Sequence, residues 1–307
     1  MVRSIGIIGL SEGNGHPFSY GSIVNGYSPE GMAASGWPGI YEYVRRRHAS
    51  EFGLAGWRIT HAWTQYPEST KKLCDACRIP NAVEAYVEFL GNVDAVIIAR
   101  DDHETHFQMA RPFLEAGLPV FVDKPLSLEP LELRAFRPYL EKGQLMSCSG
   151  MRYARELDET RADLAAYGQL KLIRGAIVLS WEKYGVHLIE AILGITPAHP
   201  VSVRMLPAEH ASAVVRLDDG VIIQIDALGE CARTFHLEFF GTLRTGAFDI
   251  NDNFSMFRRM LWQFAESIRT GQPAIPADRT LEIMRVLIAG RISRSENREV
   301  LLNELPL

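Results

Sequence analysis

The sequence predicts an α/β fold, with a doubly wound parallel sheet at the N-terminus and an α+β domain with a large mixed or antiparallel sheet behind it. Up to Pro125, apolar runs alternate with helical patterns of about 10–15 residues, which is typical of parallel strands joined by right-handed crossovers. From Leu170 onward strand patterns dominate and are separated by turn residues such as Asp218-Asp219-Gly220, as antiparallel hairpins require. A chain of 307 residues suits two domains, which we place at residues 1–125 and 126–307.

Apolar, β-branched runs mark the strands of the first domain. The run SIGIIGL at residues 4–10 ends at glycine and is typical of a buried parallel strand. The helical pattern at residues 103–116 ends before Gly117, a common helix stop. We expect further strands at residues 57–63, 94–99 and 119–122, and further helices at residues 68–77 and 81–90.

Residues 28–57 read as an insertion rich in Gly, Pro, Trp and Tyr, with an amphipathic piece at residues 41–48. We interpret the aromatic residues of this region and of the segment just before it as packing against the sheet, with stacking on a sugar face as the alternative. These aromatic residues are Phe18, Tyr20, Tyr27, Trp37, Tyr41 and Tyr43.

Behind Pro125 the pattern changes from alternating elements to a strand-rich region closed by two helices. Turn residues separate the apolar strand runs, so we expect hairpins there. We expect helices at residues 126–140, 153–166, 256–269 and 281–295, and strands at residues 145–148, 170–181, 201–206, 212–217, 221–228 and 235–241.

Composition and charge exclude several classes of partner. The formal net charge of -5 offers no basic stripe for a nucleic-acid backbone, and no apolar run is long enough to span a membrane. Four scattered cysteines and the lack of a secretory leader predict a cytoplasmic protein. The CxxC pair Cys74 and Cys77 has no second pair to complete a zinc site, so we interpret both as packing residues and expect no metal.

A glycine-rich turn follows the first predicted strand, where a Rossmann domain holds the pyrophosphate of a dinucleotide. Only the first glycine of the GxGxxG pattern is in register, and Ser and Asn take the second and third places. Two further glycines stand in a lengthened loop and are candidates for the same role. The candidate pyrophosphate-binding residues are Gly9, Ser11, Gly13, Asn14 and Gly15.

The end of the second predicted strand lacks the acid that normally holds the adenosine ribose. Thr64 and Gln65 stand there instead, and both can donate a hydrogen bond to a ribose hydroxyl or a phosphate. NAD and NADP are therefore both candidate cofactors.

Lys124 leaves the carboxyl end of a predicted buried strand, and Pro125 fixes the turn behind it. In doubly wound sheets that end of the strands lines the ligand crevice. A lysine there can hold a substrate hydroxyl and stabilise the oxyanion that develops during hydride transfer.

These motifs resemble those of the glucose–fructose oxidoreductase, inositol dehydrogenase and MocA family (Gfo/Idh/MocA), and the resemblance runs over most of the chain. Its best stretch is residues 95–125, AVIIARDDHETHFQMARPFLEAGLPVFVDKP, although Asp123 stands where the family usually has Glu. Gly150-Met151-Arg152-Tyr153 is similar to the family's turn near the substrate. Gly185-Val186-His187-Leu188-Ile189-Glu190 looks like its G-x-H-x-x-(D/E) helix.

The resemblance implies a nicotinamide-dependent oxidoreductase acting on a secondary alcohol or ketone of a sugar, cyclitol or nucleotide-sugar, assembled as a homodimer or homotetramer. It makes Lys124 the residue that orients the reacting hydroxyl and His187 the general acid and base, work that suits the near-neutral pKa of histidine. It places the cofactor near Asp102, His106, Asp123 and Lys124, and the substrate near Lys124, Arg152, Tyr153, Lys183 and His187.

One departure from the family concerns the residue four positions before the histidine, where many members carry aspartate and this chain has Lys183. A carboxylate beside His187 would raise the histidine pKa, whereas a nearby ammonium would lower it. Glu182 and Glu190 are alternative groups for the proton relay. Two other functions stay open: a glycosidase that uses bound NAD for transient oxidation, and a non-catalytic homologue that senses a ligand.

Overall fold

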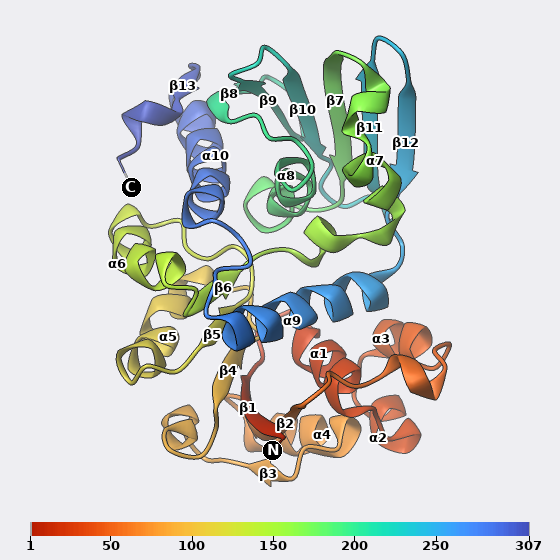
Figure 1. Ribbon diagram of the computed structural model, residues 1–307, viewed down its shortest axis with the longest axis vertical. Coiled ribbons are helices and arrows are strands. Elements are labelled where there is room, and N and C mark those ends of the chain that lie inside the picture. The colour runs from red at the N-terminus through yellow and green to blue at the C-terminus, as the bar shows by residue number, and fades with distance from the viewer. Residues whose placement is uncertain (1, 307) are drawn as a thin grey trace. The chain divides into compact units, whose positions relative to one another are not determined.

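The computed structural model describes residues 2–306, and the chain forms two compact units (Figure 1). The first unit combines residues 1–126, 135–147 and 257–276, and the second combines residues 127–134, 148–256 and 277–307. Each unit is built around its own sheet. The predicted fold class, a parallel sheet followed by a mixed sheet in a second unit, is confirmed.

The sheet of the first unit has six parallel strands in the order β3-β2-β1-β4-β5-β6. This is the Rossmann order, in which strands are added on one side of β1 up to β3 and on its other side from β4 onward. Sheets of this kind bind ligands outside the carboxyl ends of the strands at this switch point. The β-branched and apolar residues of the inner strands are fully buried, as both faces of a parallel sheet require. The strands are β1 (Arg3–Ile8), β2 (Trp57–Trp63), β3 (Asn81–Ala82), β4 (Ala95–Ile98), β5 (Val120–Val122) and β6 (Leu145–Ser147).

Helices connect these strands and cover the sheet (Figure 1). Proline in the first turn begins four of them, since proline fixes a helical φ and lacks only an N–H that would be unpaired there. The helices and 3-10 turns are α1 (His16–Asn25), α2 (Pro29–Ala33), α3 (Pro38–Val44), η1 (Ala49–Glu51), α4 (Pro67–Cys77), η2 (Tyr86–Phe89), η3 (His103–Thr105) and α5 (His106–Glu115).

Two later helices contribute to the first unit only in part. Helix α6 (Pro130–Glu141) joins it from residue 135, and helix α9 (Asn253–Thr270) joins it from residue 257. Phe264 of α9 packs on Phe121 of β5 with ring centroids 5.8 Å apart, and both rings are fully buried. Helix α9, which comes late in the chain, thus supplies part of the core of the first unit.

The second unit contains a seven-stranded mixed sheet in the order β12-β11-β7-β10-β9-β8-β13. Only β7 and β10 pair in parallel; the other neighbours are antiparallel. The strands are β7 (Leu170–Ile177), β8 (Pro200–Leu206), β9 (Ala211–Leu217), β10 (Ile222–Ala227), β11 (Phe235–Gly241), β12 (Thr245–Asp249) and β13 (Val300–Leu301).

Two helices pack on this sheet, α8 against β7 and α10 against β8. Helix α8 follows a π-helical turn, η7, whose Trp181 donates from Nε1 to the carbonyl oxygen of Leu287, 3.1 Å away in α10. The helical elements of this unit are η4 (Gly150–Tyr153), η5 (Arg155–Leu157), α7 (Asp158–Ala162), η6 (Leu164–Tyr167), η7 (Trp181–Gly185), α8 (Val186–Leu193), α10 (Ala277–Glu296) and η8 (Leu302–Glu304).

Several predicted elements differ from the observed ones. Residues 81–90 hold the short strand β3 and a 3-10 turn in place of a helix. The helix expected from residue 126 starts only at Pro130, and the one expected at residues 153–166 is broken into short turns. Strands β12 and β13 were not predicted.

Within residues 2–306, no helix combines the length and the apolar character that a membrane crossing demands. The same residues contain no group of three or more His, Cys, Asp or Glu side chains placed to hold a metal ion. Cys77 is buried against Ser22, with its sulfur 3.6 Å from the serine Oγ, and burial raises the pKa of its thiol to about 12.

Candidate functional site

The loop between β1 and α1 lies at the carboxyl edge of the parallel sheet and contains three glycines, of which Gly13 and Gly15 have different surroundings. Gly13 has φ 74°, and a Cβ added to it would meet nothing within 4 Å. A Cβ on Gly15 would lie 2.6 Å from the side chains of Trp37 and Ile40. Gly13 therefore leaves an open tip that a ligand can approach, whereas Gly15 lets helix α3 pack against the loop.

Ser11 and Asn14, which replace two glycines of the usual pattern, fix the loop to neighbouring strand ends. Ser11 Oγ donates to Asp101 Oδ1 over 2.6 Å and accepts from the Asp101 backbone N–H over 3.1 Å. Asn14 Nδ2 donates to Asp123 Oδ2 over 3.3 Å, and Asn14 Oδ1 accepts from the His16 backbone N–H over 2.7 Å. The loop is held by side chains at the ends of β4 and β5.

His16 is a functional candidate that the sequence analysis missed. Its Nδ1 contacts Asp123 Oδ2, and its ring stacks on Tyr20 with centroids 5.1 Å apart. Burial by itself raises the pKa of Asp123, but the neighbouring His16 and Lys124 outweigh burial and hold that pKa below its usual range. The sequence signal was Gly15-His16-Pro17, because proline in the first turn fixes the helix start and so puts His16 at the carboxyl edge of the sheet.

Lys124 is buried at the carboxyl end of β5, with 3% of its surface exposed. Its Nζ lies 3.6 Å from Asp101 Oδ2, and its backbone N–H donates to Asp123 Oδ1 over 2.8 Å. Asp101, which the sequence analysis did not single out, therefore contacts both Lys124 and Ser11. The structure brings the predicted lysine and the predicted loop together.

Thr64, which is predicted to face the adenosine ribose, is buried in the structure. It is 3% exposed, and its Oγ1 donates to the Tyr66 carbonyl oxygen over 2.8 Å and lies 2.8 Å from Thr70 Oγ1. The Thr64 hydroxyl thus forms hydrogen bonds within the turn that precedes α4. Gln65 Oε1 accepts from the Leu10 N–H over 2.9 Å, so its carbonyl faces the β1–α1 loop.

Asp102 and His106, both predicted to lie near the cofactor, differ in accessibility. Asp102 is partly exposed and forms a two-pronged ion pair with Arg100, at 2.9 Å and 2.5 Å. His106 is fully buried, with Nδ1 3.0 Å from the Leu126 carbonyl oxygen and Nε2 2.9 Å from the Arg100 carbonyl oxygen. Two backbone carbonyl groups thus hold the His106 ring, and its contact with the cofactor stays a prediction.

The loop residues fit the pyrophosphate of a dinucleotide. Among residues 2–306, the backbone N–H groups of Glu12 and Gly13 donate to no protein acceptor, and helix α1 begins directly behind them. Backbone amides at a helix N-terminus favour phosphate. The nearby carboxylates of Asp101 and Asp123 already accept hydrogen bonds from Ser11 and from Asn14.

In the second unit, His187 lies near the start of α8 and is 7% exposed. Its Nδ1 is 2.6 Å from Ser149 Oγ, and the rings of Tyr184 and Phe235 lie 5.2 Å and 6.5 Å from its own. The π-helical turn η7 leads directly into α8, and such turns are frequent at functional sites. The contact with Ser149 at Nδ1 helps to set the orientation of the imidazole.

Arg152 and Glu190 form a buried ion pair beside this histidine's helix, with Arg152 Nε donating to Glu190 Oε2 over 2.7 Å. Burial raises the pKa of Glu190 above its usual range, although Arg152 opposes the shift. Arg152 Nη2 has no hydrogen-bond partner within residues 2–306. Burial likewise raises the pKa of the Tyr153 hydroxyl next to it.

Lys183 lines a hollow of about 610 Å³ within the second unit. Trp181, His210 and Arg294 also line this hollow, and the backbone N–H of Lys183 donates to Ser180 Oγ over 3.3 Å. His187 is not among the residues that line it.

A family model for an oxidoreductase family with an NAD-binding Rossmann fold, Gfo/Idh/MocA, matches residues 39–148, about a third of the chain. Residues 39–148 belong to the Gfo/Idh/MocA oxidoreductase family. The match includes Asp102, Asp123 and Lys124 and starts after the β1–α1 loop. The loop, with Ser11 and Asn14 at two glycine places, thus lies outside the matched segment, as do the neighbouring elements β1, α1 and α2.

Other comparisons show a short stretch of sequence similarity and a shared fold. The protein YceM of Salmonella typhimurium is 34% identical over 77 residues, which cover 24% of this chain and 23% of that protein's length. Apo scyllo-inositol dehydrogenase from Lactobacillus casei shares the fold over 98% of both chains, with a TM-score of 0.77 and 15% identity. Myo-inositol 2-dehydrogenase from Lactobacillus plantarum also has a TM-score of 0.77, at 16% identity, over 98% of this chain and 99% of its own. An oxidoreductase from Agrobacterium radiobacter, crystallised with NAD+, L-tartaric acid and magnesium, has a TM-score of 0.74 at 13% identity over all of both chains.

Proposed function

We propose that this chain is an NAD- or NADP-dependent oxidoreductase that interconverts a secondary alcohol and a ketone on a sugar, cyclitol or nucleotide-sugar. The observation that carries the proposal is the buried Lys124 at the carboxyl end of β5, 3.6 Å from Asp101, which in turn holds the β1–α1 loop through Ser11. A lysine and a phosphate-binding loop at the same sheet edge suit a dinucleotide and a hydroxyl substrate. The family of residues 39–148 supports it.

The cofactor would be held by the loop tip around Gly13 and by the first turn of α1, with Asp102, Asp123 and Gln65 as further neighbours of that edge. When bound, a nicotinamide supplies the acceptor or donor of the hydride. No carboxylate stands at the end of β2, where the ribose-binding acid of an NAD enzyme is expected, so both nicotinamide cofactors remain candidates.

Lys124 and His187 divide the work at the substrate oxygen. The Lys124 ammonium donates to that oxygen and stabilises its negative charge, which develops as the O–H bond breaks in oxidation and as the C–H bond forms in reduction. In the oxidation direction His187 accepts the hydroxyl proton, and in the reduction direction it returns this proton to the carbonyl oxygen. Ser149 Oγ lies 2.6 Å from Nδ1 of His187 and orients the ring for this proton transfer. Arg152 and Tyr153 are proposed to bind substrate hydroxyls.

A solved structure of the same fold supports the proposed substrate class. One solved structure of scyllo-inositol dehydrogenase from Lactobacillus casei holds NAD(H) and scyllo-inositol and covers 99% of this chain at 16% identity. We propose a polyhydroxylated ring as substrate for this chain as well, and a homodimer or homotetramer as its assembly.

The test has two stages. NADH and NADPH are first titrated against the protein by nicotinamide fluorescence, and hydride transfer is then followed at 340 nm on a panel of inositols, sugars and nucleotide-sugars. We expect saturable binding of at least one dinucleotide and turnover of at least one ring alcohol. Absence of dinucleotide binding would refute the proposal.

A ligand sensor without turnover is the second candidate, favoured by the serine and asparagine at two glycine places of the loop. It predicts tight dinucleotide or sugar binding with no hydride transfer on the whole panel. Measurable turnover on any ring alcohol excludes it.

A further inference from the structure

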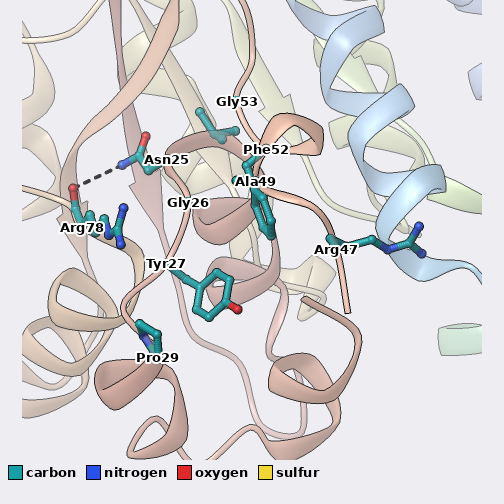
Figure 2. A pocket seen from close by; sticks show the side chains of 10 residues that line it. Asn25, Gly26, Tyr27, Pro29, Arg47, Ala49, Phe52, Gly53 and Arg78 are labelled. Atoms are coloured by element: carbon teal, nitrogen blue, oxygen red, sulfur yellow. Dashed lines mark hydrogen bonds between the residues drawn. The ribbon is translucent and has the colours of Figure 1, made fainter. Parts of the chain in front are cut away.

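A second hollow lies in the first unit at the C-terminal end of α1, away from the cofactor loop. It measures about 420 Å³, within the range of small-molecule sites. Because α1 has ten residues, its two ends lie about 15 Å apart, so this hollow is separate from the loop at the N-terminal end. Its lining residues are Val24, Asn25, Gly26, Tyr27, Pro29, Arg47, Ala49, Phe52, Gly53 and Arg78 (Figure 2).

The lining carries positive charge and an aromatic wall. It contains two arginines and no acidic residue. Tyr27 and Phe52 approach each other with ring centroids 5.6 Å apart and an interplanar angle of 48°. Such a lining favours a ligand that combines an anionic group with a flat apolar ring.

Arg78 stands in a backbone conformation that an arginine rarely adopts. It ends helix α4 with φ 53°, in the left-handed region, and its N–H donates to the Cys74 carbonyl oxygen. Helices usually place glycine or asparagine there, since other side chains strain the backbone. Residues held in such strained conformations cluster at functional sites, so the choice of arginine points to a use for its side chain.

The backbone around Arg78 is firmly supported, whereas its guanidinium is available. Asn25 Nδ2 donates to the Ile59 carbonyl oxygen over 2.8 Å, and Asn25 Oδ1 accepts from the Ile59 N–H over 3.0 Å. Asn25 Nδ2 also donates to the Arg78 carbonyl oxygen over 3.5 Å (Figure 2). Within residues 2–306 the Arg78 guanidinium has neither a hydrogen bond nor an ion pair to the protein. By contrast, Arg47 lies 3.5 Å from Glu51, and its guanidinium points away from the other lining residues in Figure 2.

We propose that this hollow binds a small planar anion, a ring bearing a phosphate or a carboxylate, with the anionic group on Arg78 and the ring against Tyr27 and Phe52. A guanidinium forms paired, charge-assisted hydrogen bonds with either anion. The ring adds apolar contact, so inorganic phosphate alone binds more weakly than a ring that carries phosphate.

The experiment uses the full chain and two probes, phenyl phosphate and benzoate, which distinguish the two anionic groups. Calorimetric titration compares them with phenol and inorganic phosphate, which carry the ring or the charge alone. We expect at least one probe to bind at millimolar concentration or below, and both controls to bind more weakly than that probe.

Arg78→Gly is the decisive variant because a structural role and a binding role predict different results. Glycine relieves the left-handed strain, so the variant should fold with an equal or higher thermal midpoint. Binding of the probe should fall roughly tenfold or more, the usual effect of losing charged hydrogen bonds. Arg47→Ala, which removes the arginine turned toward Glu51, is the matched control and should change probe affinity far less.

Three outcomes would overturn the proposal. They are undiminished probe binding by Arg78→Gly, phenol or inorganic phosphate binding as tightly as the probes, and no probe binding by the wild type. Dinucleotide affinity, measured in the same Arg78→Gly variant, should be unchanged; a matching loss would show that the probes occupy the cofactor site instead.

Discussion

Ser149 Oγ lies 2.6 Å from Nδ1 of His187, and the two residues come from different elements, the start of η4 and helix α8. Ser149 also accepts from the Met151 backbone N–H over 3.1 Å, so its own position is fixed. A histidine held at Nδ1 by a hydroxyl needs no carboxylate neighbour to orient its ring. This pairing gives the proposed acid and base a defined geometry although Lys183 replaces the family aspartate.

Removing the His187 or the Ser149 side chain should slow the proposed reaction, and the loss of His187 should slow it more. His187→Ala should lower kcat about 10²–10⁴-fold, the usual contribution of a general acid or base. Ser149→Ala keeps the imidazole but frees its orientation, so we expect a smaller loss and an altered pH–rate profile. The measurement is kcat against pH on the best ring alcohol, with Ser267→Ala, another buried serine, as the control. Full activity in His187→Ala would reject the proton-transfer role.

Lys124→Met should lower turnover much more than dinucleotide affinity, because the ammonium acts on the substrate oxygen. Loss of one positioned charge of this kind typically costs about 10²–10³-fold in kcat. Stopped-flow turnover and fluorescence titration of NADH on the same preparation separate the two effects. An equal loss of turnover and of NADH affinity would assign Lys124 to cofactor binding rather than to the substrate oxygen.

Gly13→Val should weaken dinucleotide binding, because the branched side chain fills the open loop tip. Gly36→Val is a matched control, since Gly36 also has a positive φ, 87°, and open space around it. Both variants carry the same kind of backbone strain, so their thermal midpoints should fall by similar amounts. Equal dinucleotide affinity in the two variants would contradict the placement of the pyrophosphate.

Gly15→Val should mainly impair folding, whereas Gly13→Val should mainly weaken dinucleotide binding. Its side chain would collide with Trp37 and Ile40, so we expect a loss of folded protein rather than a selective loss of affinity. Thermal denaturation of the purified variant measures this effect. A variant with wild-type stability and weakened dinucleotide binding would assign Gly15 to the cofactor instead.

Asp123→Asn should destabilise the first unit at neutral pH and much less in acid. The folded-state pKa of Asp123 is lowered, so its stabilising effect is present above the ordinary carboxyl pKa of about 3.9. That effect is lost as the pH falls through the still lower folded-state pKa. We expect a deficit of about 1–3 kcal/mol at pH 7, measured by urea unfolding, that shrinks toward pH 3. A deficit independent of pH would show that the charge of Asp123 does not matter.

Local patterns predicted the elements whose residues carry their own signal. Strand β2 has the predicted bounds, Trp57–Trp63, because the apolar run is bounded by turn residues on both sides. The helix expected at residues 153–166 is broken by distant partners. Glu156 Oε1 accepts from the backbone N–H groups of Asn251 and Asp252, both at 2.9 Å, and such contacts override helix propensity.

The residues of the candidate site could be predicted from the sequence only where a local motif marks them. Lys124 and the glycine-rich loop could be found from sequence because each has a local motif at a strand end. Asp101 could not, since its role arises from a contact to Ser11, which is remote in sequence. His16 has a local signal in the proline that follows it, but its contact to Asp123 is equally remote. The burial of Thr64 could not be predicted for a related reason: a pattern names the residue at a strand end but does not show which way its side chain turns.

The packing of Phe264 on Phe121 has a consequence for how the chain is made. On the ribosome, β5 emerges long before the segment of α9 that covers it, so the apolar surface of the parallel sheet stays exposed for most of synthesis. Uncovered apolar surface of this kind attracts chaperones and promotes aggregation. A nascent chain stalled before residue 257 should therefore bind chaperone through its first half, and release should coincide with the emergence of α9.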